Sequence, residues 1–425
     1  MKTRIKPVTL GCSKNTVDTE HLLASLPRDR FMIVDPGAEF CDVILLNTCG
    51  FIGDAKQESI EAILEAVECK KRGEASKVVV FGCLSQRYPK ELAQEIPEVD
   101  AFFGARDIAP VLEYLGAGKP LPTERRRLES KGYAYLKISE GCDRRCSYCA
   151  IPFIRGPHRS VPMEEILLEA GKLAAKGVKE LILIAQDSTY YGLDLYSKRC
   201  IAPLVRKLSQ IPGIEWIRIH YSYPDDFPED LLEEMAGNPK VCKYLDIPLQ
   251  HISDEVLSRM RRNVTSQWTR SLVKRMREKV PGVVLRTTMI VGHPGEGEEE
   301  FGELLQFVRD GAFQRLGAFT YSEEDGTYGQ RHYKDIIPQE EKDRRYDALM
   351  SLQKEISLSF NLSRVGTVER VIVDDCMDGM LVCRSQWESP EVDGEILVRG
   401  EARIGDFLNV RIVAADDYDL AAEIV

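Results

Sequence analysis

Three short apolar segments near the N-terminus each run directly into a cysteine: Cys12, Cys49 and Cys83. Helical patterns alternate with these segments, and a βαβαβα order predicts a parallel sheet. Because parallel strands end at one edge, where open α/β sheets bind ligands, we expect the three thiols to converge. Buried cysteine is common in any core, but three strands out of three argue against chance. The expected strands are 5–10, 43–47 and 77–81, and the expected helices are 18–26, 57–69 and 90–96.

Composition indicates a globular chain of several domains. Hydrophobic residues make up 44% and charged residues 29% of the 425 residues, which excludes disordered and collagen-like classes. No segment approaches the roughly 18 consecutive apolar residues of a membrane span, and the N-terminus lacks a signal-peptide pattern. We therefore expect a cytoplasmic protein without a membrane partner, in which those of the twelve cysteines that cluster bind metal or serve redox chemistry rather than form disulfides.

The rest of the chain predicts two further domains. A Gly-, Pro- and Arg-rich linker covers residues 116–127. Six β-like segments then alternate with helices or long loops, which predicts a partial (βα)6 barrel of the TIM type with chemistry at its carboxyl-terminal mouth. An open doubly wound sheet is the alternative. A final helix at 339–363 precedes a small antiparallel β-barrel of five strands. The six core segments are 133–138, 181–185, 216–221, 244–248, 283–291 and 316–321, and the expected domains are 1–120, 128–360 and 364–425.

The second domain opens with three cysteines, Cys142, Cys146 and Cys149, in a Cys-x3-Cys-x2-Cys run. Iron–sulfur clusters are held by cysteine thiolates, and three ligands for a four-iron cubane leave one iron open for chemistry. Zinc is the alternative, but structural zinc sites usually have four protein ligands in matched pairs, and no fourth ligand is evident. The run therefore favours a catalytic iron–sulfur site.

This cysteine run, with Tyr148 before its last cysteine and a (βα)6 pattern behind it, resembles the radical S-adenosylmethionine (SAM) superfamily. The resemblance implies that the open iron binds SAM and that a reduced cluster cleaves it to a 5′-deoxyadenosyl radical. It also implies that the segment 292–296 passes near the adenine, although its glycines could simply allow a tight turn. The candidate SAM contacts, each of which could instead form only loop or inter-strand hydrogen bonds, are Tyr148, Gln186, Asp187, Gln250, Arg286 and Thr288.

The whole chain, with its spaced N-terminal cysteines and TRAM-like final barrel, resembles the methylthiotransferases. The resemblance implies a second 4Fe-4S cluster on Cys12, Cys49 and Cys83, whose open iron carries sulfur or methylsulfide. In the implied mechanism one SAM methylates that sulfur, and another yields the radical that removes a hydrogen from the substrate. The electron donor and the sulfur carrier stay open.

Charge and two segments separate the branches of this family. Residues 366–425 hold five basic and fourteen acidic residues, a net charge of −9 within the total of −11, which suits a basic partner better than a polyphosphate. A solvated acidic face is the bland alternative. Segments 11–18 and 184–189 resemble the RimO-type branch, which modifies an aspartate of small-subunit ribosomal protein uS12.

We therefore expect methylthiolation of the β-carbon of an aspartate in uS12. The alternatives are a MiaB-type enzyme acting on a tRNA adenosine, which would bind bare tRNA with strong salt dependence, and a non-catalytic iron–sulfur factor that binds ribosomes. Three arginines, Arg259, Arg261 and Arg262, either meet ribosomal RNA near the substrate or form a solvated helix end.

Overall fold

The computed structural model describes residues 1–311 and 313–425 and divides into two compact units, each described by itself. None of the helices in these residues is long and apolar enough to cross a lipid bilayer. Residues 140–144 and 149–169, which follow the linker in sequence, pack with the N-terminal unit. The first unit comprises Met1–Glu129, Glu140–Arg144 and Cys149–Glu169, and the second comprises Ser130–Ser139, Arg145–Tyr148 and Ala170–Val425.

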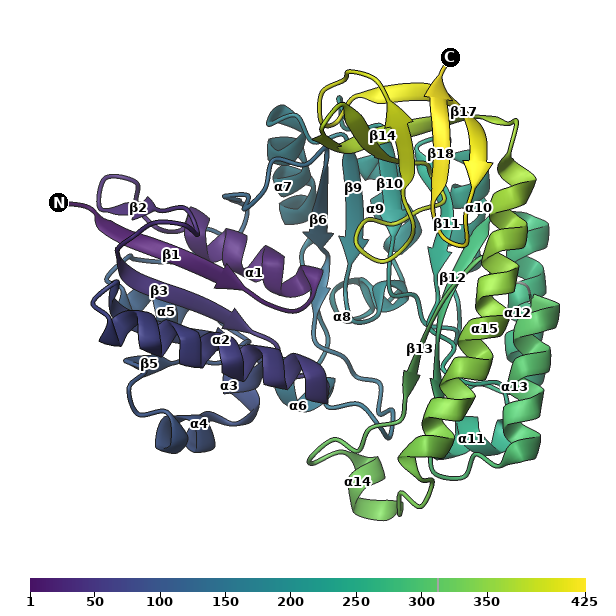
Figure 1. The fold of residues 1–425 in the computed structure, drawn as a ribbon, viewed down its shortest axis with the longest axis horizontal. Helices are drawn as coiled ribbons and strands as arrows, with labels where there is room; N and C mark the ends of the chain where they lie inside the picture. Colours follow the sequence, from purple (N-terminus) through teal and green to yellow (C-terminus); the bar gives the residue numbers. More distant parts are fainter. Residues whose placement is uncertain (312) are drawn as a thin grey trace. The chain divides into compact units, whose positions relative to one another are not determined.

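The first unit contains the expected parallel sheet, extended by two edge strands that the sequence did not reveal (Figure 1). The strand order is β2-β1-β3-β4-β5, and every pairing is parallel. Thr9 is in register with Asn47, and Asn47 with Phe81, so the three central strands end at one level. The strands are β1 (Thr3–Thr9), β2 (Phe31–Ile33), β3 (Cys41–Thr48), β4 (Ala75–Gly82) and β5 (Ala101–Phe102).

Helices cover both faces of this sheet. Leu22 and Leu23 pack with Ile5 on one face, and Ile63 packs with Val80 on the other. Burying such side chains supplies the main driving force for the layer packing. The first helix begins five residues earlier than expected, directly after the extended backbone of Cys12. The helices are α1 (Ser13–Ala24), α2 (Gly53–Lys71), α3 (Cys83–Arg87), α4 (Pro89–Glu95), α5 (Ala109–Tyr114) and α6 (Ile151–Arg155).

The second unit is built on six parallel strands in the order β13-β12-β11-β10-β9-β6. Neighbours in the chain are neighbours in the sheet, as in a partial barrel, whereas a doubly wound sheet would reverse direction partway. The partial-barrel expectation is therefore confirmed. All five residues of β9 are buried, as expected of a parallel strand covered on both faces. The strands are β6 (Tyr133–Lys137), β9 (Glu180–Ile184), β10 (Trp216–Ile219), β11 (Val241–Asp246), β12 (Val284–Val291) and β13 (Arg315–Thr320).

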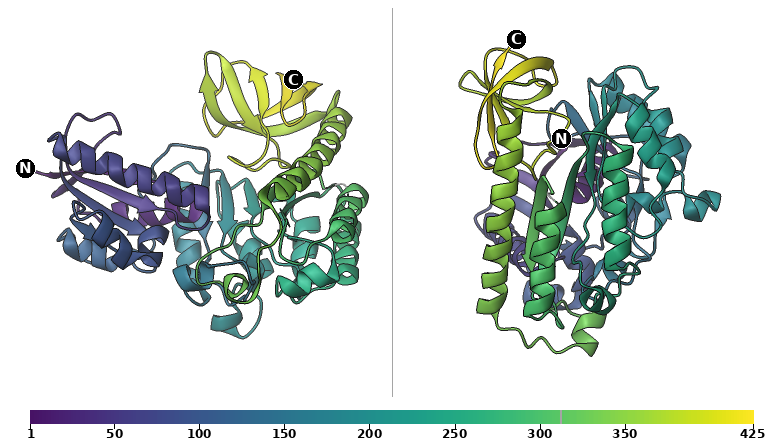
Figure 2. Two further views of the ribbon diagram at one scale, coloured as in Figure 1. Left: turned by 60° about the horizontal axis from the view of Figure 1, so that its bottom comes forward. Right: turned by 90° about the vertical axis from the view of Figure 1, so that its right-hand side faces the viewer.

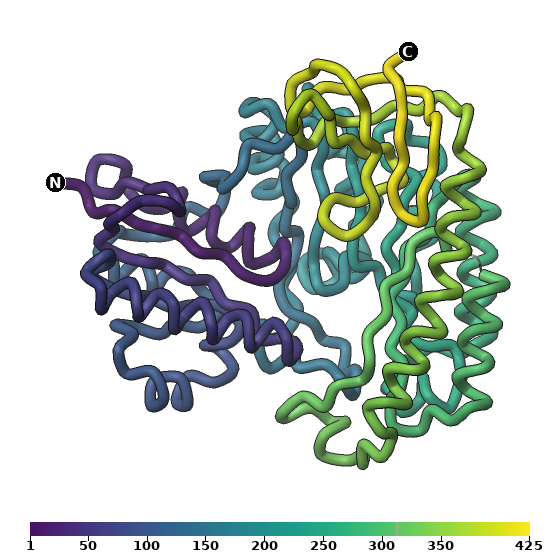
Figure 3. The backbone as a smooth tube through the Cα atoms, in the orientation of Figure 1, coloured from purple at the N-terminus to yellow at the C-terminus, as the bar shows by residue number. Residues whose placement is uncertain are grey.

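Helices follow these strands, and the longest leads out of the core. Figure 3 traces the chain from this helix, α15, directly into the C-terminal barrel. The short strands β7 (Ser139–Glu140) and β8 (Arg159–Ser160) flank the second cysteine run. The helices of the core region are α7 (Met163–Ala175), α8 (Leu193–Tyr196), α9 (Ile201–Leu208), α10 (Glu229–Gly237), α11 (Asp254–Arg259), α12 (Ser266–Lys279), α13 (Glu298–Gly311), α14 (Tyr328–His332) and α15 (Gln339–Arg364), with a 3-10 turn at Ser188–Tyr190.

The C-terminal strands close into a barrel of order β14-β15-β16-β18-β17, drawn in yellow in Figure 2. Four of its five junctions are antiparallel as expected, but β16 pairs with β18 in parallel, so the barrel is not purely antiparallel. Its interior is apolar, with Val371, Leu381 and Val410 fully buried. The strands are β14 (Val368–Met377), β15 (Met380–Arg384), β16 (Ile396–Arg399), β17 (Phe407–Ala415) and β18 (Leu420–Ile424).

Buried ion pairs fix this barrel to the amino-terminal ends of the core strands. Glu180, the first residue of β9, accepts hydrogen bonds at 2.8 Å from Arg218 of the core and from Arg384 of the barrel. Arg315, the first residue of β13, pairs with Glu388 at 2.9 Å. The barrel therefore covers the end of the sheet opposite the carboxyl-terminal mouth.

Candidate functional site

The three cysteines at the strand ends of the first unit come together. Cys12 is exposed, while Cys49 and Cys83 are buried. Burial raises the pKa of Cys49, and it raises that of Cys83 to about 12; the nearby Cys12 thiol adds to both shifts. The thiols therefore lie within range of one another's charge, as the topology predicted.

Asparagine side chains tie these strand ends together beneath the thiols. Asn15 is fully buried and donates to the carbonyl oxygens of Leu10 at 2.8 Å and Thr48 at 3.2 Å. Asn47 in turn donates to the Asn15 carbonyl oxygen at 2.9 Å. These bonds satisfy backbone groups that leave the sheet ladder, and so they hold the loops that carry the cysteines.

Glycines next to the cysteines allow the loops to approach closely. An added Cβ on Gly11 would lie 2.7 Å from Cys49 Cβ, and one on Gly50 would lie 2.7 Å from Leu84 Cα. Gly82 has a φ of +110°, and a Cβ there would lie 2.6 Å from the Thr48 nitrogen. Only glycine fits such contacts. No side-chain carbon from these three positions therefore occupies the space next to the thiols.

A buried arginine that sequence reasoning missed contacts this site. Arg155, the last residue of α6, places its Nε 3.3 Å from Cys83 Sγ. Its charge opposes the rise in the pKa of Cys83. Arginine is usually a surface residue, and the separation of 72 positions in sequence hides the contact from any local pattern.

The second cysteine run forms the loop between β7 and α6, and all three of its cysteines are partly exposed. Its first part is held within the first unit, because the Cys142 nitrogen donates to the Gly156 carbonyl oxygen at 3.0 Å. Asp143 accepts from the His158 nitrogen at 3.1 Å. The loop is therefore tied at its amino end to the turn after α6.

The middle of the same loop is held within the second unit through Ser147. Its nitrogen donates to the Met260 carbonyl oxygen at 2.9 Å, and its carbonyl oxygen accepts from Gly329 at 2.7 Å. Its hydroxyl lies 3.3 Å from His293 Nε2. Burial lowers the pKa of His293 to about 4, so this imidazole is neutral near pH 7 and supports the loop.

Arg262 organises the aromatic residues beside Cys146. It donates to the Tyr148 hydroxyl at 3.2 Å and stacks over the Tyr223 ring at 4.4 Å. The Tyr223 hydroxyl lies 3.9 Å from Cys146 Sγ. Arg262 is only 6% exposed, so neither expectation for it, RNA contact or a solvated helix end, is correct. Its cation is used internally, because it lies over the Tyr223 ring and donates to the Pro248 carbonyl oxygen.

Three of the expected SAM contacts lie beyond the carboxyl ends of core strands. Gln186 and Asp187 follow β9, and Asp187 accepts from the Thr189 hydroxyl at 2.6 Å. Gln250 follows β11 with a φ of +74°, and its Oε1 is buried without a hydrogen-bond partner in the described residues. Tyr221, after β10, is also left-handed at +59°. Such strain and an unmet acceptor are typical of ligand sites.

Arg286 and Thr288 lie inside β12 rather than at its end, because that strand continues to Val291. Arg286 faces Asp246 at 3.6 Å and Asp393, in a loop of the C-terminal barrel, at 3.4 Å. Its guanidinium is thus directed to one carboxylate of the core and one of the barrel. The expected strand 283–291 already enclosed both residues, so the expectation that they stand at a strand end was wrong.

Within the described residues, no three His, Cys, Asp or Glu side chains are close enough to hold a single metal ion. An iron–sulfur cubane has a different requirement, because each thiolate binds its own iron and the sulfurs stand around the cluster.

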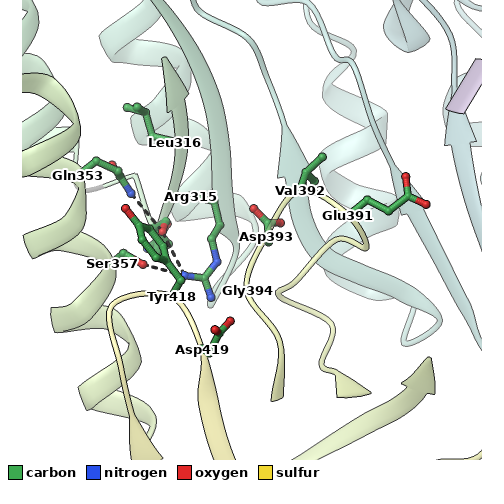
Figure 4. Close-up of a pocket in the computed structure, with 11 residues that line it drawn as sticks. Arg315, Leu316, Gln353, Ser357, Glu391, Val392, Asp393, Gly394, Tyr418 and Asp419 are labelled. Atoms are coloured by element: carbon green, nitrogen blue, oxygen red, sulfur yellow. Dashed lines mark hydrogen bonds between the residues drawn. The ribbon is translucent and has the colours of Figure 1, made fainter. Parts of the chain in front are cut away.

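A cavity of about 320 Å³ lies elsewhere, where the C-terminal barrel meets the core (Figure 4). It is lined by residues of β13, α15 and the barrel loops, including Gln353, Asp393 and Tyr418. Arg315, at its base, donates to Ser357 at 3.1 Å. The cavity is thus at the amino-terminal end of the core strands and belongs to the joint between core and barrel rather than to the thiol sites.

Sequence models of three families match this chain. The Radical SAM superfamily matches residues 136–308, and the TRAM domain matches residues 365–425. The uncharacterized protein family UPF0004 matches residues 4–104, which include the three strand-end cysteines. Together these matches cover the core, the final barrel and most of the N-terminal unit.

Curated relatives cover nearly the full length. The chain is 50% identical over 424 residues to the ribosomal protein uS12 methylthiotransferase RimO of Bacteroides fragilis, covering 98% of each. It is 49% identical over 431 residues to the protein of the same name from Porphyromonas gingivalis, covering 100% of this chain and 99% of that one.

Solved structures show the same fold at much lower identity. The radical SAM methyltransferase TsrM from Kitasatospora setae superposes with a TM-score of 0.55 at 16% identity, over 75% of this chain and 72% of that one. The cobalamin-dependent radical enzyme OxsB superposes with a TM-score of 0.52 at 14% identity, over 84% and 56%. At these identities the likeness establishes the fold.

Proposed function

Because this chain belongs to the RimO family of ribosomal protein uS12 methylthiotransferases, we propose that it replaces a β-hydrogen of an aspartate in uS12 with a methylthio group. The chain is a sulfur-transferring radical SAM enzyme. The proposal adds the target atom, the use of two 4Fe-4S clusters, and the residues that hold them.

The observation that carries the proposal is the convergence of Cys12, Cys49 and Cys83 at one sheet edge. The donor set consists of thiols alone, which suits iron–sulfur ligation. Close approach at Gly11 and Gly50 keeps side-chain carbon out of the space beside the sulfurs. These residues therefore fit a cluster with three protein ligands and one open iron.

The second cluster is proposed on Cys142, Cys146 and Cys149. Their thiols are partly exposed, and the loop that carries them is anchored through the backbone of Cys142 and Ser147. The loop is therefore held in place while its thiols stay accessible to a cluster. When bound, a reduced cluster with SAM supplies the radical that removes hydrogen from a C–H bond, and the cluster on the other cysteines supplies the sulfur.

Residues around the mouth are proposed to hold and orient SAM. Gln250 offers an unmet amide oxygen after β11, and Gln186 and Asp187 stand at the end of β9, two strands away in the same sheet. Tyr148 is held in place by Arg262. Thr288 contributes its carbonyl oxygen to the Gln250 nitrogen at 2.8 Å and so shapes the strained turn, while Arg286 is proposed to act from the strand interior.

The acidic C-terminal barrel is proposed to favour a basic protein partner. Its net charge of −9 attracts basic polypeptides and repels the phosphates of RNA. The relatives' name specifies a ribosomal protein, and ribosomal proteins are basic. Both observations argue for the protein substrate over tRNA.

The test is turnover by the purified, anaerobically reconstituted protein with SAM, sulfide and a chemical reductant. Purified uS12, intact small ribosomal subunits and bulk tRNA are offered separately, and each product is analysed by mass spectrometry. We expect 5′-deoxyadenosine, and a methylthio group in place of one hydrogen on an aspartate of uS12. A gain on tRNA adenosine instead, or no 5′-deoxyadenosine with any substrate, would overturn the proposal.

A further inference from the structure

We propose that Arg155 is a positioning residue for the N-terminal cluster, which holds the Cys83 thiolate and raises the reduction potential of the cluster that this thiolate binds. This inference rests on the proposed function, because it requires a cluster on Cys12, Cys49 and Cys83. It goes further by assigning a role to a residue outside both cysteine sets.

The geometry around Arg155 uses all three of its nitrogens. Nε lies 3.3 Å from Cys83 Sγ, and Nη2 lies 2.5 Å from Asn15 Oδ1. Nη1 contacts Asp18 at 2.5 Å and Glu140 at 3.2 Å. The residue is 4% exposed, so these contacts replace water around the cation.

The charges at the site explain why a cation is needed there. Asp18 and Glu140 bring two negative charges to the Nη1 side of the Arg155 guanidinium, and ligation of iron requires a third, on the Cys83 thiolate beside Nε. Without Arg155 these charges would face one another in a poorly solvated space, where repulsion is strong. Its guanidinium therefore stabilises negative charge at Cys83 and any electron added to a cluster bound there.

The same contact links the two cysteine sets through the chain. Arg155 lies six residues after Cys149, on the helix that ends the second cysteine loop. Ala150 and Ile154 of this segment pack with Cys83 in one apolar cluster. Arg155 thus fixes the helix after one cysteine run against a ligand of the other.

Lysine could not reproduce this arrangement. The planar fork directs Nε to sulfur while both Nη atoms serve oxygen acceptors, whereas an ammonium is a single point charge. R155K should therefore keep part of the electrostatic effect, and R155Q should lose it.

The test isolates the N-terminal cluster in full-length protein. A parent variant with Cys142, Cys146 and Cys149 all changed to Ala is reconstituted with iron and sulfide. Three properties are then measured in this parent and in the parent that also carries R155Q or R155K. They are the iron content, the electron paramagnetic resonance of the reduced cluster and its midpoint potential. We expect R155Q to shift the midpoint potential to more negative values, and R155K to shift it less.

Arg125 provides the matched control. Its side chain is as buried as that of Arg155, 2% exposed in both cases, and it pairs with the carboxylates of Glu20 and Glu169. R125Q therefore also removes a buried cation between two carboxylates, but these are Glu20 and Glu169 rather than the Asp18 and Glu140 that surround Arg155. We expect its potential to match that of the parent.

The outcomes separate this inference from the function on which it rests. A potential unchanged in R155Q, with iron retained, overturns the role of Arg155 and leaves the cluster proposal standing. An equal shift in R125Q also overturns it, because the effect would then come from general loosening. A parent that binds no cluster contradicts the proposed function itself. If R155Q does not fold, the resonance and the midpoint potential of R155K are compared with those of the parent. A change in both supports the inference, and unchanged values overturn it.

Discussion

The backbone of Gly11 lies against the side chain of Cys49, so that an added Cβ on Gly11 would stand 2.9 Å from Cys49 Sγ. Gly11 also has a φ of +85°. We predict that G11A displaces the Cys49 thiol and lowers the iron bound by the parent variant that lacks the second cysteine run. Iron and sulfide analysis after reconstitution provides the measurement.

The control for G11A is G73A. Gly73 has a similar φ of +80°, but a Cβ there meets nothing within 4 Å. Both variants carry the backbone strain of a left-handed alanine, about 1–2 kcal/mol. Equal iron content in the two variants would mean that the contact with Cys49 does not matter.

The two cysteine sets should fail in different ways. Changing Cys12, Cys49 and Cys83 to Ala should leave formation of 5′-deoxyadenosine intact while methylthiolated product disappears. Changing Cys142, Cys146 and Cys149 to Ala should abolish both, because the radical then cannot form. Chromatography of 5′-deoxyadenosine and mass analysis of uS12 distinguish these patterns. Loss of 5′-deoxyadenosine in the first variant, in folded protein, would contradict the division of roles.

Glu180 should be essential for stability rather than for chemistry. It lies fully buried between Arg218 and Arg384, and E180Q leaves two buried cations undercompensated. Breaking a buried ion pair on one side typically costs about 3–5 kcal/mol. Denaturant unfolding of E180Q should show a loss of this size.

The matched control is E215Q, which removes the exposed pair between Glu215 and Arg370 at 2.9 Å. This pair also joins the core to the C-terminal barrel, but exposed pairs contribute about 0–1 kcal/mol. Similar losses in E180Q and E215Q would show that burial at the joint contributes little.

His293 should make the apoprotein sensitive to acid. Burial lowers its pKa to about 4 in the folded state, from about 6.5 when unfolded. Below pH 6.5 the unfolded chain takes up a proton that the folded chain refuses, so stability falls as the pH drops towards 4, by about 3 kcal/mol in total. Unfolding free energies at pH 7, 6 and 5 should fall more steeply than in H293Q. If the unfolding free energies of the unaltered protein and of H293Q fall equally with pH, His293 is not the source of the acid sensitivity.

The sequence predicted those parts of the site that depend on topology. Cys12, Cys49 and Cys83 could be placed together because parallel strands share one carboxyl edge, and register then aligns Thr9, Asn47 and Phe81. The contact of Arg155 with Cys83 could not be predicted, because nothing local marks an arginine as buried.

Edge elements were the other omission. The edge strands β2 and β5 have only three and two residues, so alternation alone does not separate them from loops. The parallel pairing of β16 with β18 could not be predicted either. It depends on where β18 enters the barrel, and the sequence of β16 does not show which strand lies beside it. The same limit applies to Arg262, whose partners Tyr148 and Tyr223 meet only in the folded core.

The most direct test of the central claim is mass analysis of ribosomal proteins and tRNA nucleosides from cells that lack a methylthiotransferase. The cells are supplied with this chain, or with its variant in which Cys142, Cys146 and Cys149 are Ala. We predict a methylthio group on an aspartate of uS12 only with the unaltered chain, and unchanged tRNA. A gain on tRNA adenosine, or unmodified uS12 in cells that contain the folded, iron-loaded protein, would contradict the account.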